Sequence, residues 1–382
     1  MWQLSADELA GSISAAQNET ARSEPPRGNL GEPLMKPRLG LQLGLSFILC
    51  TAGFGESSWA AEEFSNGKFQ PTAQDKIVPR GAKIELLWNE GEFTEGPAPA
   101  ADGAILFSDI GNRIMRYDPR AKTTTVFRAT SGKANGLKFD PQGNLVACEG
   151  AAPGGNRRIS VTNPAGKTRT LADRFEGKRF NSPNDLAITT GGQVYFSDPR
   201  YVGDEPRELD FEAVFLVEPT GSVRVATREV QKPNGIIATP DDRTVYVSDN
   251  NSLADGNHQL VKFVVQSDGT LAEKKVLYDF GPHHRGIDGM TLDQQGNIYA
   301  TAGSGSEAGV YVFGTGGESL AFIATPGDPT NCVFGIGDEA ATLYITAAGP
   351  KSTPAEAKPR YGLYRIPLTI PGYHVFPKEA GK

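Results

Sequence analysis

A short phrase returns six times along the chain: a turn residue, then a β-branched or aromatic run, then a small residue or an aspartate. The copies occupy residues 103–109, 143–148, 192–198, 243–249, 296–300 and 341–346. Successive copies lie roughly 40–55 residues apart, which is the spacing of units that each hold several strands. The repeat therefore predicts an all-β fold, a six-bladed β-propeller. Such a fold gathers side chains from every blade around one axis, so residues far apart in sequence can form one site.

The predicted blades account for most of the chain. A length of 382 residues alone favours two or three domains, but the blades of a propeller add up to one closed body. We predict the propeller over residues 84–382, preceded by a polar strap over 61–83. The apolar segment 84–88 is expected to complete the last blade, because closing the ring in this way leaves no free sheet edge. Polar insertions follow four copies of the phrase and are expected to roof a site on one face: 150–157, 199–210, 250–258 and 349–361.

The N-terminal part of the chain has the layout of an export signal. Residues 35–38 are basic, residues 39–55 are apolar, and small residues follow at a cleavage site. This predicts a secretory signal peptide over 35–60 and a periplasmic or secreted protein. The apolar run is too short for a membrane span, so no stable membrane insertion is expected. Residues 1–34 form a polar leader; we expect Met35 to be the true start, with a disordered extension as the alternative.

Charge and composition argue against several classes of function. The formal net charge is −7 and no basic stripe is present, so nucleic acid is not expected as a partner. There is no G-x-S-x-G, H-E-x-x-H or P-loop motif, and with four histidines a serine triad and a zinc centre are poorly supported. The three cysteines show no zinc spacing. Cys148 and Cys332 are expected to be small buried hydrophobes, with pairing in an oxidising compartment as the alternative.

Four polar residues stand just before copies of the phrase, at the entrance of a blade. They are Glu95 in T-E-G-P, Asn184 in N-S-P-N-D, Asn234 in K-P-N-G and Asp288 in G-I-D-G-M. Taking each copy of the phrase as the inner strand of its blade, we expect all four side chains near the axis. Two carboxylates and two amides offer oxygen ligands, which suit Ca²⁺ or Mg²⁺, and their charge balances one divalent ion. A lone E-G-P or P-N-G is usually only a turn, but four such residues at the same place in four different blades favour a metal site.

Other polar residues are weaker candidates for contacts with a substrate. Glu149 follows a copy of the phrase and could place a carboxylate at the rim of the pocket. Arg179 could hold a polar ligand, with surface ion pairing as the alternative. His284 and the histidine before it could bind substrate or a proton, or form a solvated loop pair. Three aspartates close copies of the phrase and either point inward or form Asx-turns: Asp109, Asp198 and Asp249.

At these positions the chain resembles the SMP-30/gluconolactonase family of six-bladed propellers. The resemblance covers most of residues 84–367, and its most specific stretches are 134–149 and 177–201, where N-S-P-N-D is similar to the bacterial gluconolactonase branch. It implies a divalent cation, usually calcium, in the central tunnel, with four ligands: Glu95, Asn184, Asn234 and Asp288. Residues 150–155 depart from the bacterial pattern, which often has a histidine after the Cys-Glu pair.

The activity that this resemblance implies is hydrolysis of a small-molecule sugar lactone to an aldonic acid. Asp288 would be the general base beside the metal, and the metal would act as a Lewis acid. The expected cofactor is Ca²⁺, with Mg²⁺, Mn²⁺ or Zn²⁺ as alternatives. Two other functions stay open: a phosphotriesterase-type or other ester hydrolase on the same site, and a non-enzymatic calcium-containing propeller that binds a glycan or a protein. The sequence sets no oligomeric state.

Overall fold

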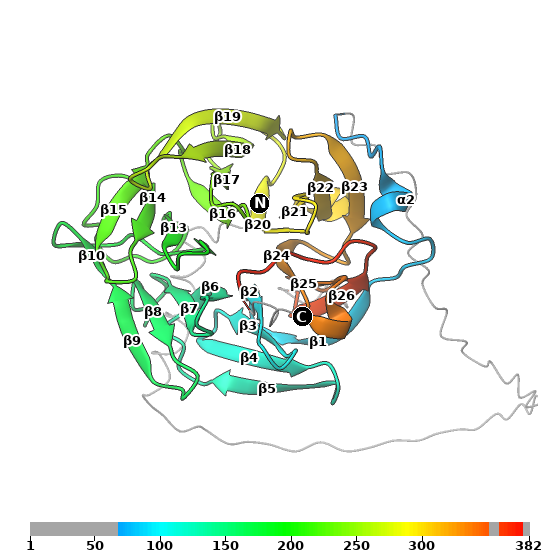
Figure 1. Ribbon diagram of the computed structural model, residues 1–382, viewed down its shortest axis with the longest axis horizontal. Helices are drawn as coiled ribbons and strands as arrows, with labels where there is room; N and C mark the ends of the chain where they lie inside the picture. The colour runs from blue at the N-terminus through cyan, green and yellow to red at the C-terminus, as the bar shows by residue number, and fades with distance from the viewer. Residues whose placement is uncertain (1–67, 351–358, 377–382) are drawn as a thin grey trace, which may run out of the picture. The chain divides into compact units, whose positions relative to one another are not determined.

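The computed structural model describes residues 68–350 and 359–376. These residues form six four-stranded antiparallel sheets around a central axis, which confirms the six-bladed β-propeller (Figure 1). The predicted leader and signal peptide, at 1–34 and 35–60, lie outside the described residues, as does the start of the strap. Within the described part of the chain, no helix is long and apolar enough to span a membrane.

The first five blades run from the axis outward in sequence order. Blade 1 holds β2 (Thr94–Pro99), β3 (Ile105–Asp109), β4 (Arg113–Asp118) and β5 (Thr123–Arg128). Blade 2 holds β6 (Ala134–Phe139), β7 (Leu145–Glu149), β8 (Arg158–Thr162) and β9 (Thr168–Ala172). Blade 3 holds β12 (Leu186–Ile188), β13 (Val194–Asp198), β14 (Ala213–Val217) and β15 (Val223–Thr227). Blade 4 holds β16 (Pro233–Ala238), β17 (Thr244–Asn250), β18 (His258–Val265) and β19 (Leu271–Asp279). Blade 5 holds β20 (Ile287–Leu292), β21 (Ile298–Ala302), β22 (Gly309–Phe313) and β23 (Ser319–Ala324).

Blade 6 is built from both ends of the propeller. It holds β24 (Pro329–Phe334), β25 (Thr342–Ala348), β26 (Tyr361–Pro367) and, outermost, β1 (Glu85–Gly91). Glu85 pairs with Arg365 in the ladder, and the Arg365 Nε donates to the Glu85 carboxylate at 2.8 Å. The prediction that the first strand completes the last blade is therefore confirmed.

The recurrent phrase forms the second strand of every blade, and its assignment as the inner strand was wrong. Its copies are β3, β7, β13, β17, β21 and β25. Neighbouring blades cover both faces of these strands, which explains their nearly continuous burial and unbroken apolar runs. The innermost strands are β2, β6, β12, β16, β20 and β24. They border the axis, and there they carry glycines and polar residues in place of an apolar run.

The core consists of separate apolar clusters between neighbouring blades. The cluster between blades 2 and 3 contains Cys148 with Phe180, Phe196 and Phe215, all fully buried. Burying one such aromatic side chain contributes about 2–3 kcal/mol. Cys332 lies in a different cluster, so both cysteines are free and buried, and the alternative of a disulfide is wrong. These clusters fix the innermost strands that carry the site.

Short elements outside the blades brace the ring. Residues 68–83 contain the helix α2 (Gln74–Ile77) and run alongside β23. The Thr72 N–H donates to the Ser319 carbonyl of this strand at 3.0 Å. Phe69 of this segment is buried against the aromatic rings of blade 5. The remaining short elements are the hairpin of β10 (Arg174–Phe175) and β11 (Lys178–Arg179) and the 3₁₀ helices Gly305–Glu307 and Gly337–Glu339.

Candidate functional site

The predicted metal ligands stand where innermost strands begin. Glu95, Asn234 and Asp288 are the second residues of β2, β16 and β20. Asn184 lies two residues before β12, and its backbone N–H donates to the Ser197 carbonyl at 2.9 Å. The six innermost strands contact one another in a closed circle around the axis (Figure 1). The four residues therefore lie at one end of the central axis, where the innermost strands begin. We call these four residues, together with the residues at the same place in the other two blades, the ring.

The long insertions lie at the same end of the propeller as the ring. They join the second and third strands of blades 2, 3, 4 and 6. Each second strand ends opposite the beginning of the innermost strand, as the pairings of Thr94 with Asp109 and of Pro233 with Asp249 show. The expectation that these insertions share one face is therefore confirmed for their described residues. We call this end of the propeller the loop face.

Three buried carboxylates at or just beneath the ring lie near enough to one another to interact electrostatically. Glu95, Asp185 and Asp288 are at most 9 % exposed. Burial raises the pKa of Glu95 well above its usual range, and the nearby charges of Asp288 and Asp185 raise it further. Burial also raises the pKa values of Asp185 and Asp288. The guanidinium of Arg285 pairs with Asp288, and the charge of Lys138 lowers the pKa of Asp185. With all three carboxylates ionised, their negative charge still exceeds these two positive charges. A divalent cation would neutralise this excess.

Asn135 is a fifth ring residue that the sequence analysis did not include. It is the second residue of β6, the place that Glu95 takes in β2. Its Oδ1 atom is buried and has no hydrogen-bond partner, although buried polar atoms are normally satisfied. An amide oxygen left in this state suits a bound cation or a donor on a substrate. The signal was present in the sequence, because A-N-G-L repeats the Asn-Gly pair of K-P-N-G in blade 4.

The donor set decides which metals the ring fits. In the described part of the chain, no three His, Cys, Asp or Glu side chains gather closely enough to hold a metal. Amide oxygens would therefore have to complete a metal site at the ring, together with the two carboxylates of Glu95 and Asp288. Hard cations such as Ca²⁺ accept carboxylate and amide oxygens in this way. The residues thus fit a hard divalent cation better than a metal that prefers nitrogen or sulfur.

The axis is closed directly beneath the ring. Four innermost strands carry glycine after the ring residue, and a Cβ atom at Gly96 would lie 2.2 Å from the Asn135 carbonyl oxygen. Blades 3 and 6 instead carry Asp185 and Asn331 at this level, and the Asn331 Nδ2 lies 3.4 Å from an Asp185 carboxylate oxygen. These two blades lie opposite each other among the six blades of the propeller. The contact spans the axis, so a substrate would reach the ring from the loop face.

Neighbouring side chains hold Asp288 in place. Arg285 pairs with its carboxylate, and another guanidinium nitrogen donates to the Pro329 carbonyl at 2.7 Å. Asn234 donates a side-chain hydrogen bond to Asp288 that lowers the pKa of that carboxyl, against the larger effect of burial. The buried Tyr201 hydroxyl lies 3.4 Å from the Asn234 Nδ2 and donates to the Asn250 carbonyl at 2.8 Å. Asp288 is thus oriented before any ligand binds.

The structure does not bring the three weaker candidates to the ring as free groups. Glu149 is fully buried and pairs across the ladder with Arg158, whose Nε donates to it at 2.7 Å, so it is no open carboxylate at a rim. The Arg179 guanidinium donates to the Asn156 carbonyl in the blade 2 insertion. His284 is buried, stacks on Phe280 and bonds the Tyr311 hydroxyl. The interpretation of His284 as part of a solvated loop pair was wrong, because Phe280 and Tyr311 pack against it and burial lowers its pKa to about 4.

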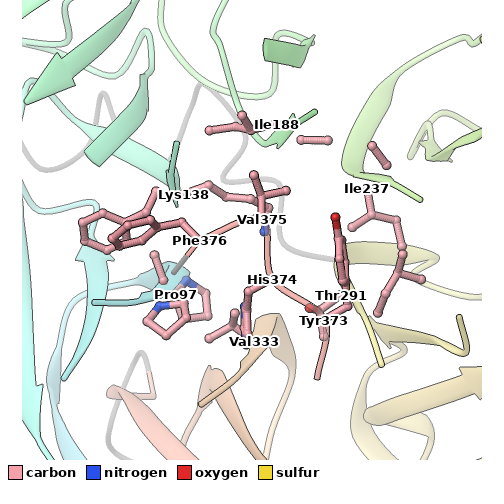
Figure 2. A pocket seen from close by; sticks show the side chains of 16 residues that line it. Pro97, Lys138, Ile188, Ile237, Thr291, Val333, Tyr373, His374, Val375 and Phe376 are labelled. Atoms are coloured by element: carbon pink, nitrogen blue, oxygen red, sulfur yellow. The ribbon is translucent and has the colours of Figure 1, made fainter. Parts of the chain in front are cut away.

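A cavity of about 70 Å³ lies at the opposite end of the innermost strands. Pro97, Ile188, Ile237 and Val333 line it from the blades, and residues 373–376 of the C-terminal tail cross it (Figure 2). The Tyr373 N–H donates to the Leu292 carbonyl at 3.0 Å, and His374 bonds the Gly335 carbonyl at 3.0 Å. The lining is mostly apolar, and it lacks the carboxylates of the ring. The tail therefore covers the far end, and the candidate site is at the loop face.

Comparisons with known proteins agree with this architecture. Residues 93–349 match the family model described as the SMP-30/Gluconolactonase/LRE-like region. A gluconolactonase from Zymomonas mobilis is 31% identical over 80% of this chain and 91% of its own length. Lactonohydrolase oryL from Aspergillus oryzae is 24% identical over 73% of this chain and 74% of its own length. The structure of a gluconolactonase from Xanthomonas campestris aligns with a TM-score of 0.64 and 28% identity, covering 77% of this chain and 92% of that chain.

Proposed function

Because the chain belongs to the SMP-30/gluconolactonase/LRE-like family, we propose that it hydrolyses a sugar lactone to the aldonic acid at the ring. The observation that carries this proposal is the electrostatic interaction of three buried carboxylates, those of Glu95, Asp185 and Asp288, of which Asp288 pairs with Arg285. Burying a carboxylate costs free energy of folding, so buried carboxylates with raised pKa values more often serve binding or catalysis than stability. The gluconolactonase and lactonohydrolase relatives point to the same substrate class.

We further propose that the ring holds a divalent cation. Glu95, Asn184, Asn234 and Asp288 would hold it, and the unpartnered Asn135 oxygen belongs to a residue at the same place in β6. Ca²⁺ is the expected ion because all these donors are oxygens; Mg²⁺, Mn²⁺ and Zn²⁺ are the ions to compare with it. When bound, the cation supplies Lewis acidity toward the lactone carbonyl.

The residues of the chain have separate roles in the proposed reaction. The Asp288 carboxylate accepts a proton from the water that attacks the carbonyl carbon. The bond from this carbon to the ester oxygen of the lactone then breaks. Asp288 then returns this proton to the released oxygen, which becomes a hydroxyl of the aldonic acid. Arg285 and Asn234 keep the Asp288 carboxylate in position. The contact of Asp185 with Asn331 closes the axis below, so water and substrate approach from the loop face.

Hydrolysis of glucono-1,5-lactone tests this proposal. The mature protein is assayed after chelation and after addition of Ca²⁺, Mg²⁺, Mn²⁺ or Zn²⁺, with correction for spontaneous hydrolysis of the lactone. We expect metal-dependent turnover that falls by roughly 100-fold or more in Glu95→Gln, because the ring loses a charged oxygen donor. Glu92→Gln is the matched control, since Glu92 is exposed three positions away, and it should keep full activity.

Two results would contradict the proposal in different ways. Full turnover in Glu95→Gln would separate the activity from the ring. No turnover with any of the four ions, in folded protein that binds metal, would redirect the search to phosphotriesters and other esters, or to a binding role for the propeller. A panel of these esters run beside the lactone distinguishes the two alternatives.

We also propose a periplasmic or secreted location, supported by the export-signal layout of residues 35–60. Sequencing the N-terminus of the mature protein from its native host tests this location. A first residue at position 61 or 62 is expected, and an intact segment before it would contradict the proposal.

A further inference from the structure

We propose that Asp109, Asp198 and Asp249 are positioning residues for the ring, each acting on the ring residue of its own blade. They are the aspartates of the recurrent phrase, and all three are fully buried. Their carboxylates accept hydrogen bonds from backbone N–H groups just before the innermost strand. The inference deepens the proposed function, and it rests on that function, because it assigns these residues an effect on cation binding at the ring.

In blade 1, Asp109 binds the backbone two and three residues before Glu95. The N–H groups of Glu92 and Phe93 donate to its Oδ1 atom at 3.0 and 3.1 Å. The other carboxylate oxygen pairs with Arg113. Asp109 stands at the end of β3, whose residues are all buried, so this contact ties the residues just before β2 to a strand packed in the core.

In blades 3 and 4 the same contact recurs at the same offset. The N–H groups of Asn181 and Ser182, three and two residues before Asn184, donate to separate oxygens of Asp198, each at 2.7 Å. The N–H groups of Gln231 and Lys232, three and two residues before Asn234, donate to the Asp249 Oδ1 at 3.0 and 2.9 Å. The repetition in three blades sets these contacts apart from incidental turns. Of the two sequence interpretations, inward pointing and an Asx-turn, neither describes this long-range contact.

In blades 2 and 5, side chains other than aspartate bind the backbone at the same position. The N–H groups of Gly132 and Lys133, just before Asn135, donate to the Asn112 Oδ1 at 2.9 and 3.1 Å. The N–H of Gly286, two residues before Asp288, donates to the Nδ1 of His284 at 2.9 Å. A side-chain acceptor therefore binds the N–H two residues before the ring residue in five blades. What the blades share is the clamped position, and the residue type that clamps it varies.

The geometry predicts unequal effects of removing the charge. Asp198 uses one oxygen for each N–H, so an asparagine there must turn its NH₂ group toward one of the two donors. Asp109 binds both N–H groups through Oδ1, and so does Asp249, whose Oδ2 shares the Gln231 N–H at 3.1 Å; an asparagine retains the Oδ1 contacts. Asp198→Asn should therefore disturb its ring residue more than Asp109→Asn or Asp249→Asn.

The test compares cation affinity with stability in the full chain. Ca²⁺ binding is measured by calorimetry and Tb³⁺ binding by luminescence, and the melting temperature is measured on the same samples. We expect Asp198→Asn to weaken binding by roughly 10–100-fold, the usual loss when a partner of a metal ligand is removed. Asp249→Asn should weaken it less.

Asp293→Asn is the matched control. Asp293 is equally buried and accepts two backbone N–H bonds, but it follows β20 at the end of the strand away from the ring. Its substitution should lower the melting temperature and leave the dissociation constants unchanged.

The outcomes separate this inference from the proposed function. If the wild type binds a cation that Glu95→Gln abolishes, and Asp198→Asn binds it with wild-type affinity, the positioning role is overturned and the proposed site stands. If Asp293→Asn weakens binding as much as Asp198→Asn at equal loss of stability, the effect is general destabilisation and the inference again fails. If the wild type binds no cation in a Glu95-dependent way, the metal site of the proposed function fails, and the inference fails with it.

Discussion

The contribution of Asp198 to the stability of this protein should fall as pH rises from about 4 to about 7. Burial raises the pKa of Asp198 from 3.8 to about 7, against the opposing hydrogen bonds from the Asn181 and Ser182 N–H groups. In the unfolded chain the carboxyl returns to its ordinary value. Between these two pKa values the folded protein binds more protons than the unfolded chain, so folding is favoured at the acid end of the range and weakened at the neutral end.

The size of the effect follows from the two pKa values. One pKa unit corresponds to about 1.4 kcal/mol, so the distance from 3.8 to about 7 corresponds to about 4 kcal/mol of unfolding free energy. Asp198 is fully buried, and solvent screening therefore takes little from this figure. In Asp198→Asn the group cannot ionise. The difference in stability between wild type and variant should therefore shift by about 4 kcal/mol in favour of the variant between pH 4 and pH 7.5.

Urea unfolding at a series of pH values measures this difference. Trp88 is the single tryptophan in the described part of the chain, and it packs on Phe107, so its fluorescence reports the closed blade 6. Both proteins are kept in chelator, which removes any contribution from a bound cation. Asp198→Ser, which also cannot ionise, should follow the Asn variant. Parallel stability curves for wild type and both variants would refute the argument that burial of this carboxyl governs the pH dependence.

Two further predictions concern the ring and the tail. Asn135→Ala should weaken cation binding by roughly 10-fold, whereas Asn135→Asp, which keeps an oxygen at this place, should retain it; equal calorimetric affinities for the Ala variant and wild type would contradict a role for the unpartnered oxygen. Burial lowers the pKa of His374 to about 4, so its contribution to stability is present above pH 6.5 and is lost as pH falls toward 4. Carboxypeptidase should therefore remove the tail faster at pH 5 than at pH 7, and His374→Gln should reduce this difference; the same acceleration in the variant would assign it to another group.

The repeat made the architecture predictable, because the second strand of each blade meets the same physical demand. A strand covered on both faces is expected to be largely apolar, and such an apolar run occurs six times in the sequence. The same regularity misled the assignment of the inner strand. The innermost strands, such as β12 with three residues, are too short and too rich in glycine and polar residues to show a period.

The ring was predictable where local spacing defines it. Glu95, Asn184, Asn234 and Asp288 each stand shortly before a copy of the phrase, and the circle of innermost strands follows from the fold. The axial contact of Asp185 with Asn331 joins residues 146 positions apart, so no local pattern announces it.

The environments of Glu149 and His284 were also decided by packing that the sequence pattern does not show. Arg158 reaches Glu149 across a strand pair, and Phe280 and Tyr311 enclose His284. In both cases the residue type was consistent with a role at the site, and only the packing of other segments excluded it as a free group.

The closure of blade 6 by β1 has a consequence for the way the protein is made. Glu85 and Arg365 are 280 positions apart, so the strand that leaves the ribosome first must wait for nearly the last one. Bringing such distant segments together costs about 2 kcal/mol more in chain entropy than closing one hairpin-linked blade. Until β26 has been synthesised, the nascent chain holds finished blades beside an open sheet edge that can pair with another molecule. A translation product that stops a few dozen residues early should therefore aggregate, although almost every blade in it is complete.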